Sequence, residues 1–466
     1  MTAQNSSGGS PFLAGNFAPW RREEDWGDLI VRGELPRELE GTYYRNGPNP
    51  AFDPLGRYHW FDGDGMIHAI HLSQGRATYR NRWVRSQGLE EEFRAGRALY
   101  YGLLDFGKGD GRFKNTANTN VVFHAGRLLA LMEGALPTEV DAAGLETLGE
   151  FDFAGRLQGP MTAHPKVDPD TGELFFFGYS PVAPFLTFYR ADRNGELVAA
   201  EPLPGGLPAM VHDFAITEHY AVFFVCPLLF RLENVGTERP VFSWEPECGT
   251  LWGVVPRYGS GQEVRWFEGE ACFIFHCMNA FEDGGAVIVD VARYPEMKFL
   301  EPAQPGGTAH DFSQQPATLW RYRVDPAGGR VHGEERFDAI CEFPRIDERR
   351  TGRPYRYGFA VARNSSASAP SGMPKFNGLA KFDWYRGTMQ VRDFGSHAGL
   401  GEAVFVPSEN AEEGQGYLMA LVYDETRDRS EFHIVSAEDF LGDPVAVVEL
   451  PHRIPYGFHG TWVARS

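Results

Sequence analysis

The segment KVDPDTGELFFFGY (residues 166–179) has the pattern of a β-hairpin. Asp170-Thr171-Gly172 is a turn signal between two runs of strand-forming residues, and such turns are the strongest short-range indication of paired antiparallel strands. The same scheme recurs along the chain, in residues 121–133, 188–201, 281–292 and 322–333. Repeated hairpins with little helical periodicity between them predict an all-β protein.

Only two segments, 90–102 and 436–442, have a helical pattern, and both are short. The chain has 466 residues, of which 42% are hydrophobic, so it can form a large core. That length favours a β-propeller over a β-sandwich. No linker composition interrupts the chain, which predicts a disordered tail over residues 1–12 and one domain over residues 13–466.

The net charge of −19 argues against nucleic acid as a partner, because no basic run offsets it. The cysteines are odd in number and sparse, which predicts reduced thiols in a cytoplasmic protein; they are Cys226, Cys248, Cys272, Cys277 and Cys341. We expect no signal peptide and no membrane-spanning helix, since neither end nor interior carries the required apolar run.

Histidines and glutamates recur in apolar or small-residue settings at intervals of about 48 to 66 residues, at His164, His212, His276, Glu342, Glu402 and His459. In a propeller, the inner strands of successive blades deliver side chains to one axis. Seven blades would take about 67 residues each, at the large end for propeller modules. The spacing therefore predicts about one polar residue per blade at the axis.

Four histidines on one axis could hold a metal, because neutral imidazole suits iron, copper, zinc and nickel. A metal-bound histidine usually donates its second ring N–H to a carboxylate, a role open to Glu133, Glu342 and Glu402. From the residues alone, the histidines could equally be core residues and the glutamates partners of arginines. Nothing in the sequence points to a functional role for the other ten histidines.

Nine motifs carry a family resemblance: residues 41–52, 58–70, 115–122, 162–173, 210–217, 273–284, 341–346, 401–407 and 457–463. Together they resemble the carotenoid cleavage oxygenases over nearly the whole chain. The resemblance implies a seven-bladed propeller with a dome of loops and short helices over one Fe(II). It also implies O2-dependent scission of an alkene into two carbonyl products, without an organic cofactor.

On the matching motifs, the resemblance implies that the catalytic iron ligands are His164, His212, His276 and His459. It gives Glu133, Glu342 and Glu402 the role of hydrogen-bonding those histidines. Thr119 matches a position that crowds an open coordination site in relatives.

Relatives that cleave phenolic stilbenes carry a lysine and a tyrosine where this chain has Met132 and Leu103, with Tyr101 close by. Apolar replacements at these positions favour a carotenoid or apocarotenoid substrate. Residues 264–284 also resemble phenylpropene-cleaving relatives, so the alternative is a phenolic alkene such as a hydroxystilbene, isoeugenol or 4-vinylguaiacol, cleaved to an aromatic aldehyde such as vanillin.

An apolar substrate suggests peripheral docking on a membrane, for which residues 180–189 and 226–230 are candidate surfaces. We expect a monomer or a homodimer. A non-catalytic propeller, a calcium-dependent lactonase and a metal-dependent isomerase are competing interpretations, but four histidines suit a calcium site poorly.

Overall fold

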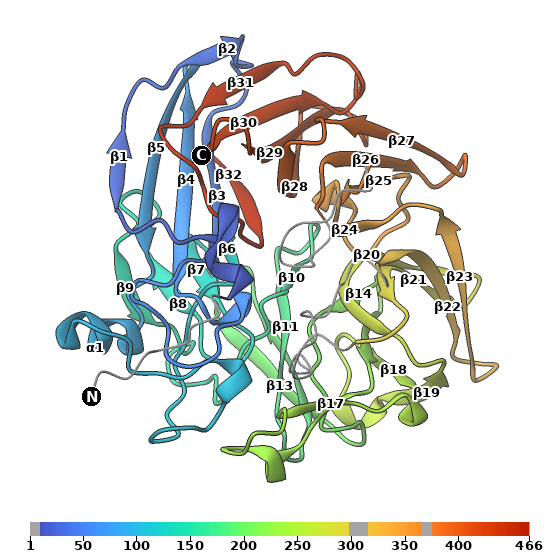
Figure 1. Ribbon diagram of the computed structural model, residues 1–466. Coiled ribbons are helices and arrows are strands. Elements are labelled where there is room, and N and C mark those ends of the chain that lie inside the picture. The colour runs from blue at the N-terminus through green and yellow to red at the C-terminus, as the bar shows by residue number, and fades with distance from the viewer. Residues whose placement is uncertain (1–9, 298–315, 365–374, 466) are drawn as a thin grey trace.

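Seven β-sheets surround a common axis in the computed structural model, which describes residues 10–297, 316–364 and 375–465 (Figure 1). The first three blades in chain order are β3 (Gly41–Pro48), β4 (Gly65–Ser73) and β5 (Arg76–Trp83); β6 (Asn120–His124), β7 (Arg127–Leu131), β8 (Thr138–Val140) and β9 (Thr147–Glu150); and β10 (Lys166–Val167), β11 (Leu174–Tyr179), β12 (Leu186–Ala191) and β13 (Leu197–Leu203).

The next four blades are β14 (Phe214–Ile216), β15 (Tyr220–Val225), β18 (Thr250–Pro256) and β19 (Arg265–Gly269); β20 (Phe273–Asp283), β21 (Ala286–Tyr294), β22 (Thr318–Asp325) and β23 (Arg330–Phe337); β24 (Cys341–Ile346), β25 (Tyr357–Ala362), β26 (Gly378–Asp383) and β27 (Thr388–Asp393); and β28 (Ala398–Pro407), β29 (Gly416–Asp424), β30 (Arg429–Ser436) and β31 (Ala446–Glu449). A separate hairpin joins β16 (Leu228–Phe230) to β17 (Phe242–Trp244).

Both ends of the chain close the ring. The C-terminal strand β32 (Gly460–Ala464) pairs with β3 and becomes the innermost strand of the first blade. The N-terminal strand β1 (Glu24–Trp26) forms the outer edge of that blade, while β2 (Val31–Gly33) pairs with β31 of the last blade. A Cβ on Gly460 would lie 2.5 Å from the carbonyl oxygen of Tyr44, so glycine is what lets β32 approach β3. The apolar tail is therefore a closing strand.

Aromatic side chains fill the spaces between blades. Phe177, Phe188, Phe214 and Phe223 pack together, with ring centroids 5.3 to 6.3 Å apart. Each fully buried ring of this size stabilises the fold by roughly 1.5–3 kcal/mol relative to exposure. The predicted all-β propeller is confirmed, and the five predicted hairpins lie on paired strands.

The helical predictions were partly wrong. The helix predicted over residues 90–102 is present as α1, but its bounds are Gln87–Ala95. It ends there because Gly96 adopts a left-handed φ of 67°. Residues 436–442 form turns in which the Ser436 hydroxyl accepts the N–H groups of Glu438 and Asp439. Within the described residues, α1 is the longest helix and, at nine residues, is too short to cross a membrane.

Short 3₁₀-helices η1 (Pro11–Leu13), η3 (Trp60–Asp62) and η4 (Leu103–Asp105) lie in the segments around the axis. Residues 1–9 of the predicted tail lie outside the described residues. The end of that tail belongs to the folded chain, because Phe12 is buried against Phe17 and His59 with ring centroids 5.6 and 5.0 Å away.

Candidate metal centre

Four imidazoles meet at the propeller axis. The side chains of His164, His212, His276 and His459 are buried, and one ring nitrogen from each lies within 4.8 Å of the others. The Nε2 atoms of His164 and His212 are 3.0 Å apart. His276 lies in β20, and the other three directly precede or closely precede the innermost strands β10, β14 and β32. The structure thus brings together all four histidines that the sequence singled out.

Irregularities in three inner strands lie at the polar residues of the axis. The pairing of β20 with β21 shifts at His276, that of β24 with β25 shifts after Glu342, and that of β28 with β29 shifts at Glu402. A β-bulge bends a strand and re-aims a side chain, and bulges are common next to active sites. The backbone of Phe343 follows the second of these shifts with a φ of 51°, which is strained for a bulky residue.

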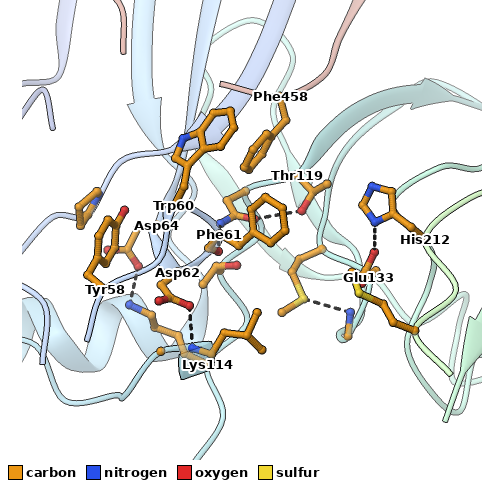
Figure 2. Close-up of a pocket in the computed structure, with 18 of the residues that line it drawn as sticks. Tyr58, Trp60, Phe61, Asp62, Asp64, Lys114, Thr119, Glu133, His212 and Phe458 are labelled. Atoms are coloured by element: carbon orange, nitrogen blue, oxygen red, sulfur yellow. Dashed lines mark hydrogen bonds and ion pairs between the residues drawn. The ribbon is translucent and has the colours of Figure 1, made fainter. Parts of the chain in front are cut away.

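Each of the three predicted carboxylates contacts a different histidine. Glu133 lies 2.5 Å from Nδ1 of His212, Glu342 lies 2.5 Å from Nδ1 of His276, and Glu402 lies 2.9 Å from Nδ1 of His459. Figure 2 shows the first of these pairs on one side of a pocket. Such contacts fix the orientation and tautomer of each ring.

The donor set fits a metal cation. A carboxylate at Nδ1 holds the proton there, so the Nε2 lone pairs of three rings point toward the common centre. Nε2 of His276 is buried and has no hydrogen-bond partner within the described part of the chain. Lone pairs that converge in a buried space repel one another unless a cation lies between them. Four neutral imidazoles suit iron and other first-row transition metals.

Burial favours the uncharged form of two of these rings. It lowers the pKa of His164 well below its ordinary value, and the neighbouring histidines add to the effect. Burial also lowers the pKa of His459 to about 4, despite the nearby Glu402. At His276, burial is outweighed by Glu342, which raises the pKa. A neutral ring is the form that binds a metal.

The carboxylate of Glu402 is held ionised. Burial alone would raise its pKa, but Arg345, His459 and the N–H of Gly460 lower it to about 2. The Arg345 guanidinium lies 3.3 Å from this carboxylate. Glu133 has a different partner, because the hydroxyl of Tyr179 donates to its Oε1 at 2.7 Å.

The three inner strands that carry no histidine bring Glu342, Glu402 and Thr119 to the axis. Thr119 directly precedes β6, Glu342 lies in β24 and Glu402 lies in β28, so each of the seven inner strands brings one of these residues or a histidine to the centre. Glu133 departs from this rule, since it follows β7, the second strand of its blade. The Thr119 hydroxyl donates to Oδ1 of Asn118 at 3.0 Å.

One carboxylate that the sequence did not single out, Asp213, connects three segments that carry histidines of the centre. Asp213 accepts hydrogen bonds from Nζ of Lys166 at 2.7 Å and from the N–H of Cys277 at 2.8 Å. Asp213 directly follows His212, and Cys277 directly follows His276. Lys166 lies two positions after His164. Their positions next to the candidate ligands were the sequence signal that could have identified them. Asp213 therefore holds the inner strands of three blades, β10, β14 and β20, in fixed positions relative to one another.

A cavity of about 570 Å³ opens onto the histidines. Its wall includes Trp60, Phe61 and Phe458, whose rings pack with centroids 4.5 to 6.4 Å apart and lie between the two sides of the pocket in Figure 2. Further aromatic side chains line it, among them Phe106, Phe113, Phe230, Phe242, Phe275, Phe343 and Phe376. This is a largely apolar space beside a polar centre.

The three residues singled out from the substrate comparison, Met132, Leu103 and Tyr101, all line this cavity. Tyr101 is 37% exposed. Of the two candidate docking segments, 226–230 is mostly buried, with Cys226, Leu228 and Leu229 in the core, so that expectation was wrong. Residues 182–184 of the other segment are exposed and follow Pro181, which lines the cavity.

The histidines without a predicted role include two that serve packing. His68 is buried and lies 2.8 Å from the hydroxyl of Tyr79. His452 stacks on Trp20 with ring centroids 3.9 Å apart. All five cysteines are free thiols, in agreement with the sequence.

Known proteins resemble this chain in sequence and in fold. The family described as "Retinal pigment epithelial membrane protein" matches residues 17–464. A carotenoid 9,10(9′,10′)-cleavage dioxygenase from Phaseolus vulgaris is 38% identical, over 98% of this chain and 90% of its own length. An isoeugenol monooxygenase from Pseudomonas nitroreducens is 34% identical, over 98% of both. The crystal structure of Pseudomonas brassicacearum lignostilbene dioxygenase superposes with a TM-score of 0.92 and 35% identity, covering 98% of this chain and 99% of that one.

Fold, site and relatives together define an alkene-cleaving oxygenase built on a seven-bladed propeller. The chain belongs to the retinal pigment epithelial membrane protein family, the family of the carotenoid cleavage oxygenases.

Proposed function

We propose that this protein is a non-haem Fe(II) dioxygenase that cleaves a C=C double bond of a carotenoid or apocarotenoid. The observation that supports this most directly is the aromatic cavity of about 570 Å³ that ends at His212, His276 and His459, three of the four grouped histidines. In the reaction, one alkene and one O2 give two carbonyl products, so both oxygen atoms are accounted for. No organic cofactor enters this balance.

His164, His212, His276 and His459 would hold the iron, with Glu133, Glu342 and Glu402 fixing three of the rings. Bound Fe(II) would supply the activation of O2 that alkene scission needs. Thr119, on the cavity wall at the centre, would restrict one side of the site.

The protein's own part is positioning and exclusion of water. Phe275 lies beside His212 with ring centroids 5.1 Å apart, and Phe343 lies 5.2 Å from His276 and 5.3 Å from His459. A planar polyene can stack on such rings, with its double bonds next to the histidines. Met132 and Leu103 give this wall apolar surface where a phenol would need polar partners.

Cleavage of a phenolic alkene is the second candidate. It is favoured by the likeness to an isoeugenol monooxygenase and to the lignostilbene dioxygenase structure. A competition experiment separates the two. Iron-loaded protein receives equal amounts of an apocarotenal, a hydroxystilbene and isoeugenol in air, and products are identified by chromatography with mass detection. We expect shortened apocarotenoid aldehydes; vanillin or a hydroxybenzaldehyde as the main product would establish the second candidate.

Peripheral docking on a bilayer would give access to such a substrate. The apolar side chains that support this proposal are Val182, which is 57% exposed, and Phe113, which is 49% exposed and lines the cavity. We expect co-sedimentation with phosphatidylcholine vesicles, weakened by Val182→Asp and Phe113→Asp. Leu441→Asp is the control, since Leu441 is similarly exposed at 58% but neither lines the cavity nor adjoins a lining residue, whereas Val182 adjoins Pro181. Equal sedimentation of all variants would contradict the proposal.

A further inference from the structure

The cavity has a second polar region besides the histidines. Nζ of Lys114 lies 2.7 Å from Oδ1 of Asp64 and 2.9 Å from Oε2 of Glu92, and all three residues line the cavity. The three side chains are 12%, 5% and 2% exposed, so this is a buried ion triad. In Figure 2, Lys114 and Asp64 lie on the far side of Trp60, Phe61 and Phe458 from His212.

One short helix joins the apolar wall to this region. Residues Trp60 and Phe61 of η3 belong to the aromatic wall, and Asp62, the last residue of η3, lines the cavity beside the triad. Asp62 makes a capping box with His59, so its carboxylate also fixes the start of the helix. The sequence WFDGD (60–64) therefore passes from the apolar wall to the polar region within five residues.

Within the described part of the chain, one N–H donor of the Lys114 ammonium has no hydrogen-bond partner. The remaining oxygen of Asp64 accepts the N–H of Ala51 at 3.0 Å, and that of Glu92 accepts the N–H of Leu99 at 2.8 Å. A lysine ammonium has three N–H donors, and two of them serve these carboxylates. Its remaining N–H is available to an acceptor oxygen in the cavity, and carboxylate lone pairs are available to a hydroxyl.

The charges at the Lys114 end of the cavity favour some ligand end groups over others. Asp62, Asp64 and Glu92 supply three carboxyl groups against the one ammonium of Lys114. An anionic end group would approach like charges in a region of low dielectric, which is costly. A neutral hydroxyl or carbonyl oxygen can exchange hydrogen bonds there without adding charge.

We propose that the Lys114 end of the cavity binds the neutral oxygen-bearing end group, a hydroxyl or an aldehyde, of the polyene substrate and rejects a carboxylate. This inference rests on the proposed function. It also makes Lys114 a residue that sets the cleavage position, because a polyene anchored at one end presents a fixed double bond to the histidines.

The first test uses the unaltered iron-loaded protein. It compares kcat/KM for an apocarotenal, an apocarotenol and an apocarotenoic acid of equal chain length. Repulsion between the carboxylate of the acid and the buried carboxyl groups predicts at least a tenfold preference for the aldehyde and the alcohol over the acid. Equal kcat/KM for all three, or a preference for the acid, would overturn the proposal.

The second test changes the residue. In Lys114→Met, kcat/KM for the aldehyde and the alcohol should fall by about tenfold and the cleavage products should become a mixture, because the neutral end group loses its N–H donor, while the acid stays a poor substrate. Lys375→Met is the matched control: Lys375 also lines the cavity, but its ammonium bonds to Glu425 and to the carbonyl oxygen of Ser396. Unchanged kcat/KM for the aldehyde together with a single product in Lys114→Met would overturn the proposal. Should that variant not fold, Lys114→Arg keeps the cation, and the comparison on the unaltered protein still decides.

A binding measurement separates this proposal from the proposed function. Without O2, ligand binding is followed by quenching of tryptophan fluorescence, since Trp60 lines the cavity. Tight binding of the aldehyde and alcohol and weak binding of the acid support the end-group proposal even where no product forms. Absence of any polyene cleavage by iron-loaded protein would instead refute the proposed function.

Discussion

The two polar regions of the cavity are built in different ways. The histidine centre stands on the inner strands of the blades, where strand irregularities and paired carboxylates fix each ring. The Lys114 region stands on connections: η3, α1 and the loop before β6. A regular sheet holds groups that must keep one geometry, whereas loops change from protein to protein and carry selectivity.

One buried carboxyl group in each region has a shifted pKa, and the two shifts are opposite. The pKa of Glu402 is lowered to about 2, because Arg345 and His459 outweigh burial. The pKa of Asp62 is raised to about 6, because burial outweighs the N–H groups of Leu103 and His59 and the charge of Lys114. The surroundings of Glu402 thus stabilise its negative charge, whereas ionised Asp62 carries a cost. The following predictions test this contrast, in order of decreasing effect.

Loss of a ring from the histidine centre should have the largest effect. We expect His276→Ala to lower iron affinity by more than roughly a hundredfold, exceeding the ~10–100-fold loss typical of removing a ligand's hydrogen-bond partner. Iron content by atomic absorption and turnover both check this, with circular dichroism to confirm the fold. His332→Ala, on an exposed position of β23, is the control. Full iron content in His276→Ala would remove it from the ligand set.

Asp62→Asn should change how stability depends on pH. Because the folded-state pKa of about 6 lies above the unfolded value, ionised Asp62 costs stability, and the cost grows as pH rises from about 4 to 6. The variant should therefore gain up to about 3 kcal/mol relative to the unaltered protein between pH 4 and pH 7. Urea unfolding at both pH values measures this difference. A pH-independent difference between the two proteins would refute the raised pKa.

Glu342→Gln should weaken iron binding by roughly ten- to a hundredfold while leaving the ligand set intact, because the amide orients His276 less firmly than the carboxylate does. Competition with a chelator gives the affinity. Glu335→Gln, at an exposed position of β23, is the matched control. Unchanged iron retention would show that the contact between Glu342 and His276 serves packing.

Tyr179→Phe should have a smaller effect. The variant removes one hydrogen bond to Glu133, and such a bond contributes a factor of about two to ten. The loss should appear in iron affinity, with the product pattern unchanged. Tyr385→Phe, at a position 72% exposed, is the control. A changed product pattern would place Tyr179 in substrate positioning instead.

The two regions also differ in how far the sequence predicts them. Six axis residues could be found because each blade repeats a strand that reaches the centre, and the closing strand explains His459. Glu133 lay off this period, and it was singled out by its apolar, strand-like setting and by the family resemblance. The strained backbone of Phe343 has no sequence signal.

The Lys114 region could not be predicted, because its members come from segments without a shared period. Asp62 and Asp64 were part of a recognised motif, but nothing in the sequence places Glu92 of α1 beside Lys114, 22 residues later. That contact depends on where α1 ends, and the predicted helix ran seven residues too far, to Gly102.

X-ray absorption at the iron edge of the Fe(II)-loaded protein tests the central claim most directly. We predict one iron per chain with four imidazole nitrogens in its shell, reduced to three in His276→Ala if any iron remains. A shell dominated by oxygen, or one with two or fewer imidazoles, would contradict the four-histidine centre.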